Sequence, residues 1–181
     1  MNRILFLVII FFFSASCGKA NNTSSQKKTE PKKNEAEAVK EDSIALPDFT
    51  LEDVDGNMHT LSDYKGKVVL INFWTIYCPS CRKEISTLVK LREKYKNEDL
   101  VILGVGFDRE SNNLKIFRNL NKINYYVLVG DKQILEKYKL KGVPTTYIMN
   151  KKGEITDPLI GYNKRVGEKI EEILLNFLKN E

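Results

Sequence analysis

Cysteine and histidine are scarce in this chain, which has three Cys and one His among its 181 residues. Cys78 and Cys81 form a C-x-x-C pair, so only Cys17 and His59 remain to complete a metal site. A structural zinc ion takes four such ligands, and a haem attachment site has His directly after the second Cys, where this chain has Arg82. This scarcity excludes zinc binding and haem attachment for the pair, and no metal is expected.

Long apolar runs and charge of one dominant sign are also missing. The apolar run at residues 4–13 is shorter than the roughly 20 residues that span a bilayer. The formal net charge is +5, but basic and acidic side chains are interspersed along residues 44–181, which argues against a nucleic-acid groove. There is no glycine-rich nucleotide loop or flavin motif, so no cofactor is expected.

Residues 1–17 have the pattern of a secretory signal, with one Arg, an apolar run and then the small residues 14–16. Cys17 stands at the cleavage point, as in the lipobox of bacterial lipoproteins, where the thiol takes a lipid. Ser14 stands where a lipobox usually has Leu. Cleavage by an ordinary signal peptidase, with Cys17 as an incidental thiol of the leader, is therefore the alternative.

The next segment, residues 18–43, consists mainly of Lys, Asn, Ser, Glu and Thr and has almost no large apolar side chain. Such a segment cannot bury enough surface to fold, so we predict a disordered polar tether. Residues 44–181 remain, which is the size of one ordinary domain with a full core.

This remaining part alternates between strand and helix patterns. Residues 49–60 are typical of a β-hairpin that turns at Gly56. Further strands are expected at residues 68–73, 100–107, 125–129 and 145–149, and helices at residues 79–95, 112–120, 132–138 and 165–178. The pattern predicts an α/β fold with a mixed central sheet and helices on both faces.

The motif Cys78-Pro79-Ser80-Cys81 lies where the first long strand leads into a helix. A helix N-terminus stabilises a thiolate, the nucleophilic form of Cys, and Pro in the first helical turn removes no needed hydrogen-bond donor. A purely structural disulfide is the alternative, but so small a loop stabilises little. We therefore expect thiol-disulfide redox chemistry.

Several motifs together resemble the thioredoxin superfamily and, within it, the TlpA/ResA-like branch of extracytoplasmic thiol-disulfide oxidoreductases. Besides the C-x-x-C motif they are the segments at residues 46–49, 65–74, 142–147 and 152–154. The resemblance covers essentially all of residues 44–181 and implies a three-layer thioredoxin-like fold with an N-terminal hairpin. Tyr77 departs from the Trp that the branch usually has before the first Cys.

The resemblance implies a role for each residue of the dithiol. Cys78 would be the exposed nucleophile, and Cys81, more buried, would resolve the mixed disulfide. Glu84 matches a Glu near the dithiol of the branch and would accept or relay the Cys81 proton. The alternative for Glu84 is an acid that favours the helix dipole. Asn72 occupies the place of a buried Asp in cytoplasmic thioredoxins, which makes Glu84 the better candidate for proton relay.

The remaining predicted site residues concern substrate contact. Val143-Pro144 resembles the cis-proline element that places backbone beside the thiols to pair with an extended substrate segment. Trp74 and Tyr77 are expected to flank the dithiol as a contact surface, with core packing as the alternative for Trp74. His59, after the hairpin turn, is expected at the surface.

The favoured function is reduction of protein disulfides outside the cytoplasm, by a chain held in the bacterial periplasm through a lipid on Cys17. Many members of the branch assist cytochrome c maturation, so the resemblance suggests apocytochrome c as a substrate. Electrons would come from a membrane thiol reductase, and no nucleic-acid partner is expected.

Two other functions are left open by the residues. Thr75 lies three residues before Cys78, as in the T-x-x-C of thiol peroxidases of the peroxiredoxin type, but Ile71 stands where those enzymes have Pro. The thiols would also suit Cu(I) in a non-catalytic copper-binding module. No companion His or Met lies near the pair in the sequence, which counts against copper.

Overall fold

The computed structural model describes residues 46–108 and 110–179. The predicted signal segment with its Cys17 and the predicted tether at residues 18–43 lie outside this part of the chain. Within it, no helix has the length and apolar character needed to cross a bilayer. The elements in chain order are β1 (Thr50–Glu52), β2 (Met58–Thr60), the 3-10 helix η1 (Leu61–Tyr64), β3 (Val68–Trp74), α1 (Pro79–Lys94), β4 (Leu100–Gly106), α2 (Ser111–Leu120), β5 (Tyr126–Val129), α3 (Lys132–Lys137), β6 (Thr145–Met149), β7 (Leu159–Ile160) and α4 (Lys164–Lys179).

The main sheet has five strands in the order β5-β4-β3-β6-β7. Strands β3, β4 and β5 run parallel, whereas β6 and β7 are antiparallel to their neighbours. Every residue of β3 and of β4 is buried. Such continuously apolar strands belong at the centre of a sheet covered on both faces, which is where the sequence pattern predicted the first of them.

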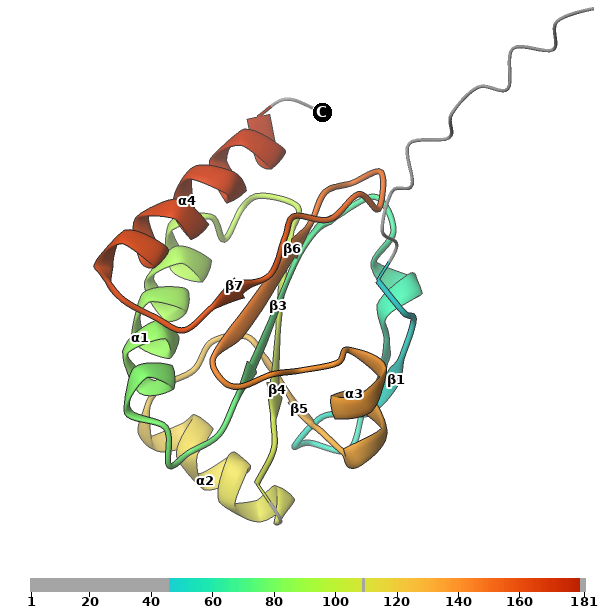
Figure 1. Cartoon of the computed structure of the whole chain (residues 1–181), viewed down its shortest axis with the longest axis vertical. Helices are drawn as coiled ribbons and strands as arrows, with labels where there is room; N and C mark the ends of the chain where they lie inside the picture. Colours follow the sequence, from blue (N-terminus) through green and yellow to red (C-terminus); the bar gives the residue numbers. More distant parts are fainter. Residues whose placement is uncertain (1–45, 109, 180–181) are drawn as a thin grey trace, which may run out of the picture. The chain divides into compact units, whose positions relative to one another are not determined.

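Two apolar cores separate the layers on either side of this sheet. Leu70 and Trp74 of β3 pack in one cluster with residues of α1, α2 and α4. Ile71 and Phe73, which alternate with them, pack on the opposite face with the β1-β2 hairpin, η1 and α3. Figure 1 shows the same division, with α1 and α4 on one side of the sheet and β1 with α3 on the other. The predicted three-layer α/β fold is confirmed.

The predicted strands and helices are present with ends that differ by one residue at most, and the predicted hairpin forms, with Thr50 opposite Thr60. One strand was not predicted. Strand β7 has only two residues and pairs with Thr145 and Thr146 at the edge of the sheet. So short a strand leaves no periodicity in the sequence by which to recognise it.

Candidate active site

The strand-to-helix junction after β3 places the two thiols. Cys78 is the N-cap residue of α1, and Pro79 occupies the first helical turn. The Cys81 amide donates a hydrogen bond to Cys78 Sγ over 3.2 Å, and the Ser80 hydroxyl lies 3.2 Å from the same sulfur. These contacts favour negative charge on Cys78 once the pair is reduced, since N-terminal amides of a helix stabilise an anion.

Cys78 and Cys81 form a disulfide in this structure, with 5.2 Å between their Cα atoms. Cys78 is partly exposed, whereas Cys81 has no exposed surface. An incoming disulfide can therefore reach only the first sulfur. This difference in exposure is the one that the sequence predicted.

A second loop brings backbone to the dithiol from the far side. The Val143-Pro144 peptide bond is cis, as predicted, and the Val143 carbonyl oxygen lies 3.8 Å from Cys78 Sγ. The Thr145 hydroxyl donates to the Gly142 carbonyl over 2.7 Å, and the Gly161 amide donates to the Pro144 carbonyl over 2.8 Å. These bonds fix the loop against β7, so that the Val143 backbone lies next to the reactive sulfur.

A buried polar cluster joins Asn72 of β3, Thr146 of β6 and Glu84 of α1, the helix that begins at the dithiol. The Asn72 amide nitrogen donates to Thr146 Oγ1 over 2.9 Å, and Thr146 Oγ1 donates to Glu84 Oε1 over 2.8 Å. All three side chains are at least 99 % buried. Burial raises the pKa of Glu84 to about 7, against the opposing effect of the Thr146 hydroxyl, which donates to the carboxyl, and of the Asn72 amide behind it.

A carboxyl with a pKa near 7 can both take up and release a proton at neutral pH. Glu84 lies one helical turn after Cys81, and both side chains are buried. The sequence identified Glu84 as a candidate but not Thr146, whose contact arises only when β6 pairs with β3. The pKa of Glu84 is therefore compatible with the predicted proton relay.

The two aromatic residues predicted to flank the dithiol have opposite exposures. Tyr77 is 83 % exposed, next to Cys78. Trp74 has no exposed surface, and its ring packs 5.3 Å from that of Phe117. The prediction that Trp74 contacts the substrate is wrong, because β3 is covered on both faces along its whole length and Trp74 is its last residue. Core packing, the alternative, is what the structure shows.

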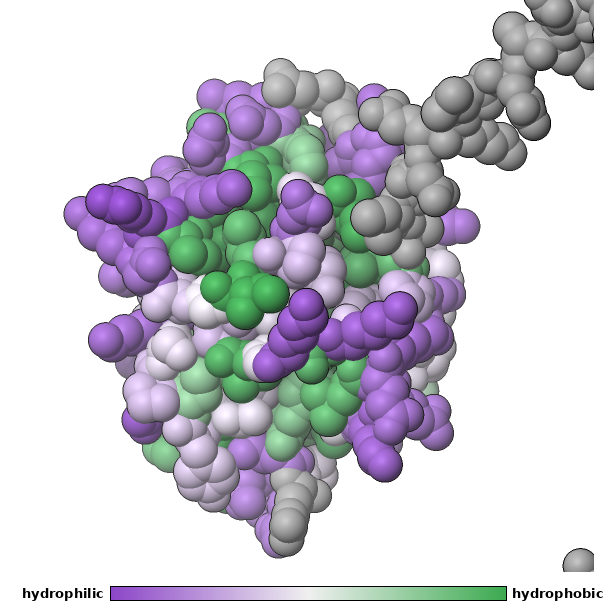
Figure 2. Space-filling model, viewed as in Figure 1, coloured by the Kyte–Doolittle hydropathy of each residue, from purple (hydrophilic) through white to green (hydrophobic). Residues whose placement is uncertain are grey.

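A hydrophobic surface adjoins the dithiol loops on β6 and β7. Figure 2 shows a group of hydrophobic side chains over these strands, bordered by hydrophilic ones. Ile160 of β7 is 58 % exposed. Together with Tyr77 and the partly exposed Val143, this surface could accept the apolar side chains of an extended segment.

His59 is not at the surface, contrary to the sequence prediction. It is a buried residue of β2, where its Nε2 lies 2.9 Å from Asp53 Oδ2 and its Nδ1 lies 2.5 Å from the Tyr64 hydroxyl. Its ring also lies 4.5 Å from that of Tyr126. Pairing of the hairpin with the region of β5 covers this imidazole, and that long-range contact leaves no trace in the local sequence.

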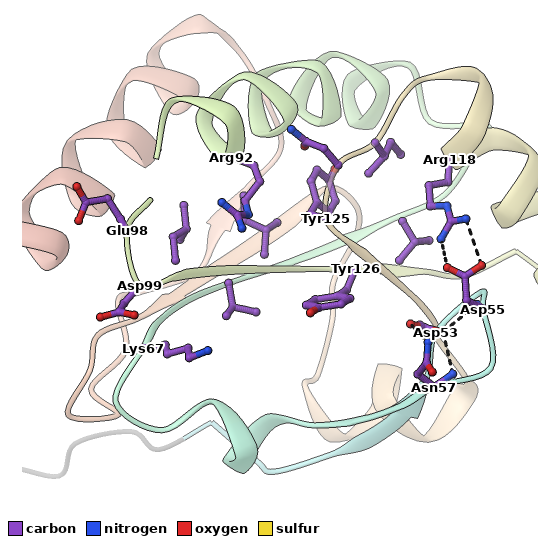
Figure 3. Close-up of a pocket in the computed structure, with 16 residues that line it drawn as sticks. Asp53, Asp55, Asn57, Lys67, Arg92, Glu98, Asp99, Arg118, Tyr125 and Tyr126 are labelled. Carbon is purple, nitrogen blue, oxygen red and sulfur yellow. Dashed lines mark hydrogen bonds and ion pairs between the residues drawn. The ribbon is translucent and has the colours of Figure 1, made fainter. Parts of the chain in front are cut away.

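A groove of about 520 Å³ lies beside β5, away from the thiols, and Figure 3 shows its charged and aromatic side chains. Asp55 of the hairpin forms ion pairs there with Arg118 and Lys115. None of the predicted site residues lines the groove. Within residues 46–108 and 110–179, moreover, no three His, Cys, Asp or Glu side chains come together as metal ligands. No cysteine lines the groove, so the dithiol junction remains the candidate active site.

Comparison with known proteins agrees with this geometry. The profile of the AhpC/TSA family matches residues 44–157. The thiol-disulfide oxidoreductase ResA of Bacillus thuringiensis subsp. konkukian is 31 % identical over 175 residues, covering 96 % of this chain and 95 % of the relative. The thioredoxin-like protein YneN of Bacillus subtilis is 34 % identical over 118 residues, covering 64 % of this chain and 69 % of the relative.

A solved structure gives the same answer for the fold. The thioredoxin domain of a thiol-disulfide oxidoreductase from Bacteroides vulgatus superposes with a TM-score of 0.65 at 28 % identity, covering 73 % of this chain and 96 % of that one. The chain belongs to the AhpC/TSA family and is, by its relatives and its Cys78-Cys81 pair, a thiol-disulfide oxidoreductase.

Proposed function

We propose that this oxidoreductase reduces disulfides of proteins outside the cytoplasm. The observation that carries the proposal is the partly exposed Cys78 at the N-terminus of α1, disulfide-bonded to a fully buried Cys81. A partner with a large contact surface suits this site, because the sulfur lies at the surface beside the exposed Tyr77 and the Val143 backbone.

The reaction starts from the reduced pair. The Cys78 thiolate attacks one sulfur of the substrate disulfide, the substrate S–S bond breaks, and the other substrate sulfur leaves as a thiolate that takes a proton. Cys81 then gives up its proton and attacks Cys78 Sγ. The mixed disulfide breaks, the second substrate thiol is released, and the Cys78-Cys81 disulfide seen here forms. Two electrons have passed to the substrate.

Glu84 is the proposed acceptor of the Cys81 proton. Its pKa of about 7 lies between those of an ordinary carboxyl and an ordinary thiol, so it can take the proton as Cys81 attacks and return it later to solvent or to the leaving thiolate. Tyr77, Val143 and Pro144 would hold an extended substrate segment beside Cys78, with main-chain pairing at Val143.

The site of action is inferred from the N-terminal segment. A signal-like run ending at Cys17 and a polar stretch at residues 18–43 support a lipid-anchored protein of the bacterial envelope, with the domain reaching its substrates on a tether. The ResA relative aligns over 96 % of this chain. By the resemblance to the ResA-like branch, we propose apocytochrome c as a substrate and a membrane thiol reductase as electron donor.

The redox midpoint of the Cys78-Cys81 pair tests the direction of the reaction. The protein is equilibrated across a dithiol buffer series, alkylated and digested, and the mass of the peptide that holds both residues gives the reduced fraction. A midpoint near that of thioredoxin, about −270 mV, supports a reductant, and one near −120 mV would assign an oxidant. Absence of a reversible two-electron transition would contradict the dithiol mechanism and favour the peroxidase or copper-binding alternative.

A further inference from the structure

A chain of two hydrogen bonds holds the carboxyl of Glu84, and its members come from three different elements. Asn72 of β3 and Thr146 of β6 are direct partners in the antiparallel register. Their side chains project to the face of the sheet that α1 covers, where Glu84 meets them. Cys81 of the dithiol and Glu84 of this hydrogen-bond network therefore belong to the same helix, α1.

The direction of each hydrogen bond follows from the donors available. The Asn72 amide nitrogen can only donate, so Thr146 Oγ1 accepts from it and keeps its own proton to donate to Glu84 Oε1. Glu84 Oε2 is buried and has no hydrogen-bond partner among the residues that the structure describes. One carboxyl oxygen is thus held and the other is left to exchange a proton.

We propose that Asn72 and Thr146 are positioning residues that hold Glu84 by Oε1 and leave Oε2 to exchange a proton with the Cys81 thiol. The inference rests on the proposed function, because it concerns the step in which Cys81 attacks the mixed disulfide. In that step the proton of Cys81 passes to Oε2, the Cys81-Cys78 bond forms, and the substrate sulfur leaves with the electron pair of the broken bond.

Few other titratable groups lie near Glu84 to affect the pKa of its carboxyl. The Cys81 thiol precedes it on α1, and the buried Tyr125 phenol, just before β5, is the titratable group whose pKa its charge affects. On α4, which packs against α1, Glu171 pairs with Lys94 at the surface. Within the described part of the chain no charged side chain shifts the pKa of Glu84, so burial, the Thr146 hydroxyl and the Asn72 amide govern it.

Removing the Thr146 hydroxyl tests the proposal. Thr146→Val keeps the shape and removes the donor to Oε1, so the carboxylate loses a stabilising bond and the pKa of Glu84 rises. The loss of one hydrogen bond to a charged group corresponds to a rise of about one to two pH units. Thr146→Ser retains the hydroxyl and should stay within about 0.3 pH unit of the parent protein.

Two readouts are taken on the full chain. Carboxyl-carbon NMR of glutamate-labelled protein, assigned with Glu84→Gln, gives the pKa of Glu84 without reference to catalysis. The pH dependence of insulin disulfide reduction gives the midpoint of the step in which Cys81 attacks. Both midpoints should rise together in Thr146→Val and return in Thr146→Ser, a rescue that a merely structural loss would not show.

Thr156→Val is the matched control, because Thr156 Oγ1 is buried without a hydrogen-bond partner among the described residues and lies outside the site. It should move neither midpoint. Asn72→Ala, which keeps the Thr146 hydroxyl but removes its orienting donor, should raise both midpoints by less than Thr146→Val does. This second variant keeps the test decisive if Thr146→Val does not fold.

The outcomes separate this inference from the proposed function. The positioning role is overturned if the pKa of Glu84 in Thr146→Val or Asn72→Ala is no higher than in Thr156→Val. It is also overturned if that pKa rises while the reduction profile stays fixed. If the parent protein does not reduce insulin at all, the proposed function fails. A higher NMR pKa of Glu84 in Thr146→Val would still show that the Thr146 contact controls the pKa of this carboxyl.

Discussion

Two carboxyls are buried on opposite faces of the same sheet, and their hydrogen-bond environments differ. Asp53, in the turn of the β1-β2 hairpin, accepts backbone N–H bonds from Asp55 and Asn57 at 2.8 and 2.9 Å and further bonds from the Asn57 amide and His59. Together these bonds outweigh burial and hold its pKa well below the ordinary range. Among the residues that the structure describes, Glu84 accepts one bond, from Thr146, and burial raises its pKa to about 7.

The comparison shows that the number of donors, rather than burial alone, decides what a buried acid can do. With all its donors in place, Asp53 stays ionised at any physiological pH and ties the hairpin together. Glu84, with one oxygen free of partners, can change its charge near neutral pH. Perturbed acids of the second kind cluster at functional sites, whereas saturated ones serve the fold.

The active site and the hairpin should respond differently to mutation, and the largest expected effect comes from removing the nucleophile. Cys78→Ser should reduce the rate of insulin disulfide reduction to that of the assay without enzyme, because Cys81 has no exposed surface with which to replace it. Its free energy of unfolding should stay within about 1 kcal/mol of the reduced parent protein. Residual turnover above background would show that the buried thiol can act directly, contrary to the mechanism.

The corresponding change at the hairpin should have the opposite profile. Asp53→Ala leaves two backbone amides and the buried His59 without their acceptor, so we expect a loss of about 2–4 kcal/mol in denaturant unfolding. The reduction rate per folded molecule should not change. Asp157→Ala, at an exposed acid, is the control and should cost less than about 0.5 kcal/mol. A loss no greater than in that control would contradict the structural role of Asp53.

The sequence predicted one of these regions much better than the other. The dithiol, the cis Val143-Pro144 bond and the central strands follow from short contiguous motifs, which carry their chemistry locally. The burial of His59 depends on the hairpin packing over the distant strand β5, where the Tyr126 ring lies against the imidazole, and His59 was accordingly misplaced at the surface. Long-range pairing of this kind is not encoded in any single window of sequence.

Within the active site the same limit applies. Glu84 was identifiable because its spacing from Cys81 matches a motif, but its bond to Thr146 spans 62 residues. Trp74 was misassigned for a related reason, since a strand-end aromatic beside a dithiol looks the same in sequence whether α2 covers it or not. Contacts with elements far away in the sequence, β6 for Glu84 and α2 for Trp74, decided both environments.

The pH dependence of stability sharpens the comparison through its sign. The folded-state pKa of Asp53 lies below its unfolded value, so its contribution is present above about pH 4 and is lost as the pH falls further. The folded-state pKa of Glu84 lies above its unfolded value, so it costs stability as the pH rises from about 4.5 to about 7. The two acids therefore act in adjacent pH windows and with opposite sign, since rising pH strengthens the contribution of Asp53 and weakens that of Glu84.

Glu84→Gln removes the stability cost of ionising Glu84 and leaves the contribution of Asp53 unchanged. A shift of between two and three pKa units corresponds to roughly 3 kcal/mol, so the variant should gain up to about that much relative to the parent protein between pH 5 and pH 8. Denaturant unfolding of both proteins at the two pH values measures it. An unchanged difference between pH 5 and pH 8 would mean that Glu84 does not titrate in this window.

The smallest expected effect concerns the surface around the thiols. Tyr77 is 83 % exposed, so Tyr77→Ala should change the free energy of unfolding by less than about 0.5 kcal/mol. If its ring contacts substrate proteins, KM for a protein disulfide rises several-fold, while reduction of a small-molecule disulfide is unaffected because that substrate needs the two thiols but no surrounding contact surface. Leu120→Ala, an equally exposed apolar residue on α2, is the matched control and should change neither rate. Equal KM values in the two variants would remove Tyr77 from the substrate surface and leave the Val143 backbone as its main determinant. The contrast would then lie within the site itself, between a backbone that binds and a ring that merely lies beside it.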